Sequence, residues 1–125
     1  MASSDDALAA AKAAVPKISV AETQALIAKG NVLVVDVRED AEVAASGKIP
    51  GALHIPRGLL ASKADPAAPT HDEAFSRDKT VVLYCGSGNR AALAGKMLQD
   101  FGYKDVRNLG GLKDWIEGGG KVEKT

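Results

Sequence analysis

The only cysteine of the chain, Cys85, lies where an apolar run gives way to glycine and polar residues, in the segment TVVLYCGSGNRAALAGKM at residues 80–97. A thiol that ends a strand and precedes a glycine loop and a helix lies among main-chain N–H groups, at the positive end of a helix dipole. Such surroundings favour the thiolate, which is the nucleophilic form of cysteine. The competing interpretation is a small buried residue that completes a strand, as many free cysteines do. The glycines and the following helix favour the nucleophile.

The five residues after Cys85 form the candidate binding loop, and they are Gly86, Ser87, Gly88, Asn89 and Arg90. Glycine adopts backbone angles that other residues avoid, so a tight loop here can turn several N–H groups toward the sulfur. Arg90 supplies a fixed positive charge at the end of the loop. The Ser87 hydroxyl can hydrogen-bond either the sulfur or the loop backbone. The loop therefore predicts a cradle for an anion attached to Cys85.

Two nucleotide-binding motifs overlap the same loop and fit it less well. A phosphate-binding loop requires Gly-x-x-x-x-Gly-Lys, but the residue five before Gly95 is Arg90. The segment GSGNRA at residues 86–91 does match the Gly-x-Gly-x-x-Ala pattern of dinucleotide sites. However, Asp105 precedes the next strand, whereas the ribose-binding acid belongs at the end of a strand. Nucleotide binding is not favoured, because it also leaves Cys85 without a role.

Three more charged residues are candidate supporting residues. Asp36 and Arg38 follow the apolar run NVLVV, and Arg57 lies in HIPRGLL. We expect Asp36 to pair with Arg90 or Arg38 and to hold the loop, because ion pairs near a site are often structural. Arg57 either faces the pocket and helps to hold an anionic donor, or is a solvated arginine at the start of a helix.

Helices and apolar strands alternate along the chain, which predicts an α/β fold with a parallel sheet covered by helices on both faces. The expected helices are at residues 19–30, 39–46, from 56, 89–101 and 112–117, the expected strands at 32–35, 52–55, 79–85 and 104–111, and a surface loop at 65–78. In parallel sheets, ligands bind beyond the carboxyl ends of the strands. Cys85 and Asp36 each lie at such an end.

The composition excludes several other classes of protein. The 125 residues suit one domain, and the 16 basic and 16 acidic side chains give no basic excess for binding nucleic acid. No apolar stretch approaches the roughly 20 residues of a membrane span, and the N-terminal segment does not resemble a secretory signal. One cysteine and two separated histidines predict neither a disulfide nor a metal site. We therefore expect a cytoplasmic protein that uses no metal and no other cofactor.

Three segments in this order resemble the rhodanese family of sulfurtransferases, specifically its single-domain members. They are VVDVRE at residues 34–39, GKIPGALHIP at 47–56 and VVLYCGSGNRAALA at 81–94, and NLGGLKDW at 108–115 fits the closing helix of the family. The resemblance implies a rhodanese-like α/β fold with a central five-stranded parallel sheet and helices on both faces. It implies a rhodanese domain at residues 17–119, a peripheral helix or flexible extension at 1–16, and a tail at 120–125.

The resemblance also implies a reaction, that of a thiosulfate sulfurtransferase. Cys85 would attack the outer sulfur of thiosulfate or another sulfane donor and carry it as a persulfide, cradled by the N–H groups of residues 86–90. A thiol, cyanide or a sulfur-accepting protein would then take the sulfur. The alternatives are a non-catalytic interaction module or sulfur carrier, and a phosphatase of the Cdc25 type. Those phosphatases have five residues between cysteine and arginine, whereas Cys85 and Arg90 enclose four, which favours sulfur over phosphate.

Overall fold

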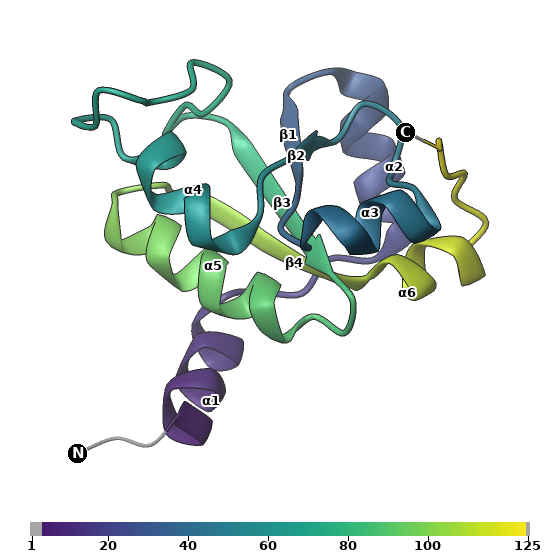
Figure 1. Cartoon of the computed structure of the whole chain (residues 1–125), viewed down its shortest axis with the longest axis horizontal. Helices are drawn as coiled ribbons and strands as arrows, with labels where there is room; N and C mark the ends of the chain where they lie inside the picture. Colours follow the sequence, from purple (N-terminus) through teal and green to yellow (C-terminus); the bar gives the residue numbers. More distant parts are fainter. Residues whose placement is uncertain (1–3, 125) are drawn as a thin grey trace.

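The computed structural model describes residues 4–124, and its helices and strands alternate as the sequence predicts (Figure 1). The elements in chain order are α1 Ser4–Ala14, α2 Val20–Lys29, β1 Val32–Asp36, α3 Asp40–Ser46, β2 Leu53–His54, α4 Arg57–Ala64, β3 Thr80–Cys85, α5 Asn89–Asp100, β4 Asp105–Gly111 and α6 Leu112–Glu117. Residues 1–3 of the expected N-terminal extension and residue 125 of the expected tail lie outside the described residues. The strands have the order β2-β1-β3-β4, and all neighbours run parallel. The carboxyl ends of β1 and β3 are therefore adjacent.

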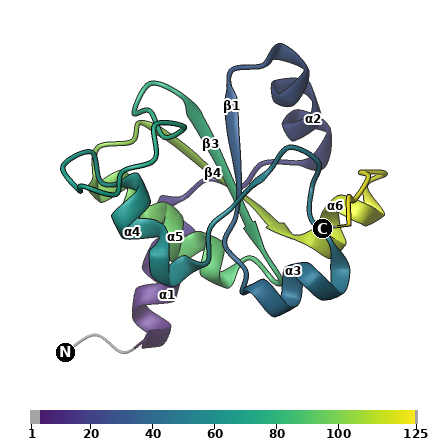
Figure 2. The ribbon, with the colours of Figure 1, turned by 45° about the horizontal axis from the view of Figure 1, so that its top comes forward.

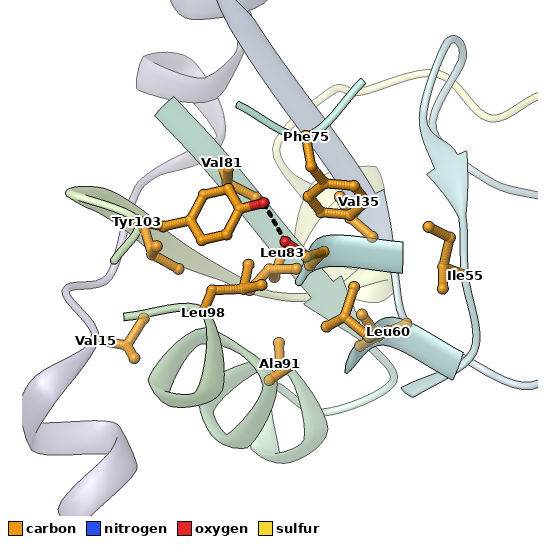
Figure 3. Packing of buried hydrophobic residues seen from close by; sticks show 14 of the residues in the cluster. Val15, Val35, Ile55, Leu60, Phe75, Val81, Leu83, Ala91, Leu98 and Tyr103 are labelled. Atoms are coloured by element: carbon orange, nitrogen blue, oxygen red, sulfur yellow. Dashed lines mark hydrogen bonds between the residues drawn. The ribbon is translucent and has the colours of Figure 1, made fainter. Parts of the chain in front are cut away.

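Helices cover both faces of the sheet, as predicted. Figure 2 shows α1, α4 and α5 on one side of the strands and α2, α3 and α6 on the other. Successive residues of a strand point to opposite faces. Accordingly, Val81 and Leu83 pack toward α5, whereas Val82 and Tyr84 pack in the second cluster with Trp115. Figure 3 shows the first cluster, in which the Tyr103 hydroxyl donates a hydrogen bond to the Ala64 carbonyl over 2.6 Å.

The expected fifth strand is wrong for the described residues, which form a four-stranded sheet. Residues 16–18 do run alongside β4, where Asn108 N–H donates to the Pro16 carbonyl and Ile18 N–H donates to the Asn108 carbonyl. Only one parallel bridge, between Lys17 and Asn108, results. The pairing stops because Ser19 already caps α2, and its hydroxyl accepts a hydrogen bond from Glu22 N–H in the predicted capping box.

The N-terminal helix α1 packs against α5. Ala11 of α1 and Val15, the residue that follows the helix, are each 1% exposed. Gly95 of α5 allows this close approach, because a side-chain carbon there would lie 3.0 Å from the methyl groups of Val15. Val15 therefore adds to the same core cluster that supports β3 and its terminal cysteine.

Candidate active site

Cys85 occupies the last position of β3, one of the two central strands of the sheet, and none of its surface is exposed. Its neighbour in β4 is Gly111, while Tyr84 pairs with Asp36 of β1 on the other side. An irregularity between Leu83 and Tyr84 shifts the register of β4 by one residue. The thiol is consequently fixed at the carboxyl edge of the sheet, as the sequence predicts.

The loop after Cys85 turns back over the sulfur. Gly88 N–H donates a hydrogen bond to Cys85 Sγ over 2.9 Å. Gly88 has a φ of 96°, in the left-handed region that favours glycine, and it is the N-cap of α5. Gly86, Ser87 and Asn89 are exposed at the solvent side of the loop. The loop thus gives the sulfur a main-chain donor and the positive end of a helix, and both stabilise negative charge there.

Two residues of β4 hold the loop, and neither was predicted from the sequence to be a functional residue. Asn108 is buried; its Nδ2 donates to the Gly88 carbonyl over 3.1 Å, and its Oδ1 accepts from Gly110 N–H over 2.9 Å. Gly111 lies against Gly86, because a side-chain carbon at Gly111 would be 2.2 Å from the Gly86 carbonyl oxygen. The only sequence signal for this support was the glycine pair in NLGG.

Arg90 pairs with Glu42 of α3, not with Asp36. Its two terminal nitrogens donate to the two carboxylate oxygens of Glu42, over 2.6 and 2.9 Å. Glu42 Oε1 also accepts the Glu39 N–H over 3.1 Å, which fixes the carboxylate on the first turn of α3. The hydrogen bonds from Arg90 lower the pKa of Glu42 to about 2, and those to Glu42 raise the pKa of Arg90. Of the two partners expected for Asp36, Arg38 is confirmed, because it binds both oxygens of Asp36, and Arg90 is not the partner.

Asp36 and Arg38 form a buried ion pair at the carboxyl end of β1. Arg38 Nη2 lies 2.8 Å from Asp36 Oδ2, and the two side chains are 4% and 0% exposed. Arg38 also donates to the Ser46 hydroxyl and to the Gly47 carbonyl, and it lies 5.8 Å from the centre of the Tyr84 ring. Every contact ties β1 to α3 or to the sheet, so the pair positions the edge that carries Glu42.

The remaining candidates are peripheral. Arg57 is exposed at the start of α4, and its guanidinium makes no ion pair within residues 4–124. His54 Nε2 lies 2.8 Å from the Arg38 carbonyl, which is a structural contact. No cluster of three or more potential metal ligands occurs among the described residues, and no helix among them is long and apolar enough to cross a membrane.

A hollow of about 310 Å³ borders the loop on the side of α1. Ser87 and Gly88 form part of its wall, together with Lys12 and Lys17. The loop is therefore open to solvent on this flank, whereas the Arg90–Glu42 pair bounds it on the side of α3.

Comparison with known proteins gives one consistent family. The model of the family described as "Rhodanese-like domain" matches residues 19–117. A human protein named thiosulfate:glutathione sulfurtransferase is 35% identical over 112 residues, which are 84% of this chain and 96% of that protein. A sulfurtransferase of Allochromatium vinosum is 38% identical over 98 residues, 78% of this chain and 83% of that one.

Among solved structures, a Rhodopseudomonas palustris protein of unknown function, described as a possible tyrosine phosphatase, superposes with a TM-score of 0.89 at 35% identity. The match covers 98% of this chain and 96% of that one, so it includes the N-terminal helix α1.

Proposed function

The chain belongs to the rhodanese-like domain family, and from that premise we propose that it is a sulfurtransferase that carries sulfane sulfur on Cys85. In the first step the Cys85 thiolate attacks the outer sulfur of thiosulfate or a related donor. The S–S bond of the donor breaks, and sulfite leaves with the electron pair. The product is a Cys85 persulfide, a covalent intermediate of the kind that divides one difficult transfer into two easier ones.

In the second step a thiolate or cyanide attacks the outer sulfur of the persulfide. The new bond joins that sulfur to the acceptor, and the electron pair of the broken S–S bond returns to Cys85 as the thiolate. A thiol acceptor is supported by the name of the human relative, which includes glutathione. A sulfur-accepting protein would enter the same step. A cytoplasmic location belongs to the proposal, because a lone free thiol is typical of a reducing compartment.

One contact carries the proposal, the hydrogen bond of 2.9 Å from Gly88 N–H to Cys85 Sγ. A main-chain donor on the sulfur is of use when the sulfur carries negative charge, both in the attacking thiolate and in the persulfide. A thiol that merely completes a strand needs no such donor.

Phosphatase activity is less well supported. Phosphate-ester hydrolysis by a cysteine nucleophile requires a general acid for the leaving group. Glu42, the carboxyl that binds Arg90 of the loop, has its pKa lowered to about 2 by Arg90, so it holds no proton at neutral pH. The four residues between Cys85 and Arg90 also leave less room than the five of the related phosphatases.

The test is an intact-mass measurement after incubation with thiosulfate. We expect the protein to gain one sulfur atom and to lose it again when cyanide or glutathione is added. Cys85→Ser should gain none. If no sulfane donor adds sulfur to the folded protein, the chain is an interaction module that uses the fold without the chemistry. If sulfur adds and leaves only to a partner protein, it is a sulfur carrier.

A further inference from the structure

The carboxylate of Glu42 lies at the mouth of the loop, where it cancels the only formal charge that the loop possesses. Arg90 is the single charged residue among residues 85–90. Both of its terminal nitrogens are occupied by Glu42. Loop and partner together thus present no net formal charge to an incoming donor.

The ion pair lies next to Gly86, the residue that follows the reacting cysteine. A side-chain carbon on Gly86, the residue after Cys85, would lie 3.2 Å from Arg90 Nη2 and 3.7 Å from Glu42 Oε2. The pair therefore lies directly against the first residue of the loop, on the side of α3. Because the Glu39 N–H also holds Glu42 Oε1, the carboxylate cannot swing away freely when a donor arrives.

The same pair is poorly placed to stabilise the fold. The side chains of Arg90 and Glu42 are 32% and 38% exposed. Exposed ion pairs contribute little to folding, because solvent screens them. By contrast, the buried Asp36–Arg38 pair nearby ties β1 to α3. The carboxylate of Glu42 is held in place and faces solvent, so its main effect is electrostatic and falls on a donor that approaches the loop.

On the side of α3, the surrounding charges do not compensate for Glu42. Around the carboxyl end of β1 and the start of α3, four carboxylates face three guanidinium groups, namely Asp36, Glu39, Asp40 and Glu42 against Arg38, Arg57 and Arg90. Only Arg57 of the three is without a carboxylate partner in the described part of the chain, and it is exposed to solvent. A dianion that approaches on the side of α3 therefore meets a flank that is neutral to slightly negative, whereas Lys12 and Lys17 line the hollow on the side of α1.

We propose that Glu42 is a specificity-determining residue that disfavours doubly charged sulfur donors and selects donors with a single negative charge at the reacting end. This inference rests on the proposed sulfurtransferase function. In either case the Cys85 thiolate attacks the outer sulfur, the donor S–S bond breaks, and the leaving group departs with the electron pair, as sulfite from thiosulfate or as a sulfinate from a thiosulfonate. The two donor classes differ in one charge that lies next to Glu42 during the attack.

The test compares thiosulfate with methanethiosulfonate, in which a methyl group replaces one charged oxygen. The measured quantity is the ratio of kcat/KM for thiosulfate to kcat/KM for methanethiosulfonate, because changes in folding or in Cys85 itself cancel in that ratio. In Glu42→Gln the ratio should rise about fivefold, which is the effect of one unit charge on another about 4 Å away in water. Glu42→Ala should raise it in the same direction. Asp100→Asn, which removes one negative charge from the exposed far end of α5, should leave it unchanged.

The outcomes separate this inference from the function on which it rests. If both donors load Cys85 and the ratio is unchanged or lower in Glu42→Gln, Glu42 only positions Arg90 and the inference is overturned. If neither donor adds sulfur to Cys85 in the native protein, the sulfurtransferase proposal itself is overturned, and the inference with it.

Discussion

Gly111 supports the active-site loop at Gly86 through contact of the two backbones, since a side-chain carbon on Gly111 would come within 2.2 Å of the Gly86 carbonyl oxygen. This contact joins the end of β4 to the residue that follows Cys85. It makes the shape of the loop depend on the absence of a single methyl group.

The change Gly111→Ala should therefore displace the loop. The φ of Gly111 is −109°, which alanine adopts without strain, so the effect would be purely steric. We expect a loss of about 1–3 kcal/mol in the free energy of unfolding, as for other overpacked sites. Persulfide formation, followed by mass spectrometry, should slow at least about tenfold because Gly88 N–H moves away from the sulfur. Gly58→Ala is the control; no atom lies within 4 Å of the added carbon, and we expect normal loading and a stability that is unchanged or up to about 1 kcal/mol higher, because alanine favours a helix more than glycine does.

The change Asp36→Asn should destabilise the protein without altering the chemistry. It leaves the Arg38 guanidinium buried beside a neutral partner, and breaking a buried ion pair costs about 3–5 kcal/mol. Urea unfolding measures the loss, and sulfur loading per folded molecule should equal that of the native protein. Arg57→Gln, at an exposed arginine, should leave stability unchanged. A stable Asp36→Asn protein that fails to load sulfur would show instead that Asp36 takes part in the reaction.

The Arg90–Glu42 pair should make the free energy of unfolding depend on pH in the acid range. A carboxyl whose pKa is lower in the folded state stabilises that state above its ordinary pKa, and the contribution is lost as the pH falls through the folded value. For Glu42 that window runs from 4.5 down to about 2. The native protein should lose more stability than Glu42→Gln across this window. The difference should be about 1 kcal/mol or less, because the pair is partly exposed. Urea midpoints measured from about pH 6 to about pH 2.5 would reveal it, and parallel curves for the two proteins would count against it.

Removal of residues 1–14 should weaken the fold but spare the reaction. The deletion takes away the buried Ala11 and uncovers Val15 and Gly95 of the α1–α5 contact. We expect a loss of about 2 kcal/mol, comparable to exposing one buried aliphatic side chain. Sulfur loading should persist, because Cys85, Gly88 and their β4 supports all remain. Thermal unfolding together with intact mass measures both effects. If the truncated protein does not fold, the residues before 17 are part of the domain and not a peripheral extension.

Local signals predicted most of the elements. Ser19 and Glu22 form the capping box that their spacing indicated, and the glycine at 30 ends α2 with a φ of 83°. The apolar run before Cys85 is a central strand, and the helix after the loop begins at Asn89. Each of these features depends on residues within one or two turns of one another, so a single sequence is enough to predict them.

The contacts that the sequence did not predict join distant segments. Glu42 and Arg90 are 48 positions apart, and no local pattern relates them. By contrast, the pair of Asp36 and Arg38, which are two residues apart, was one of the two pairings that the sequence indicated. The role of Asn108 depends on the one-residue register shift between β3 and β4. The described residues form no fifth strand, because Ser19 caps α2 and so ends the pairing of residues 16–18 with β4 after a single bridge.

The complete burial of Cys85 also governs how purified protein should behave in air. A disulfide between two molecules requires their cysteine Cα atoms to come within about 7 Å of each other. A sulfur with no exposed surface, beneath its own loop, cannot meet its counterpart on another folded copy. The chain has no second cysteine to substitute for it. Storage without a reductant should therefore yield no covalent dimer, and any cross-linked species would report unfolding rather than surface oxidation.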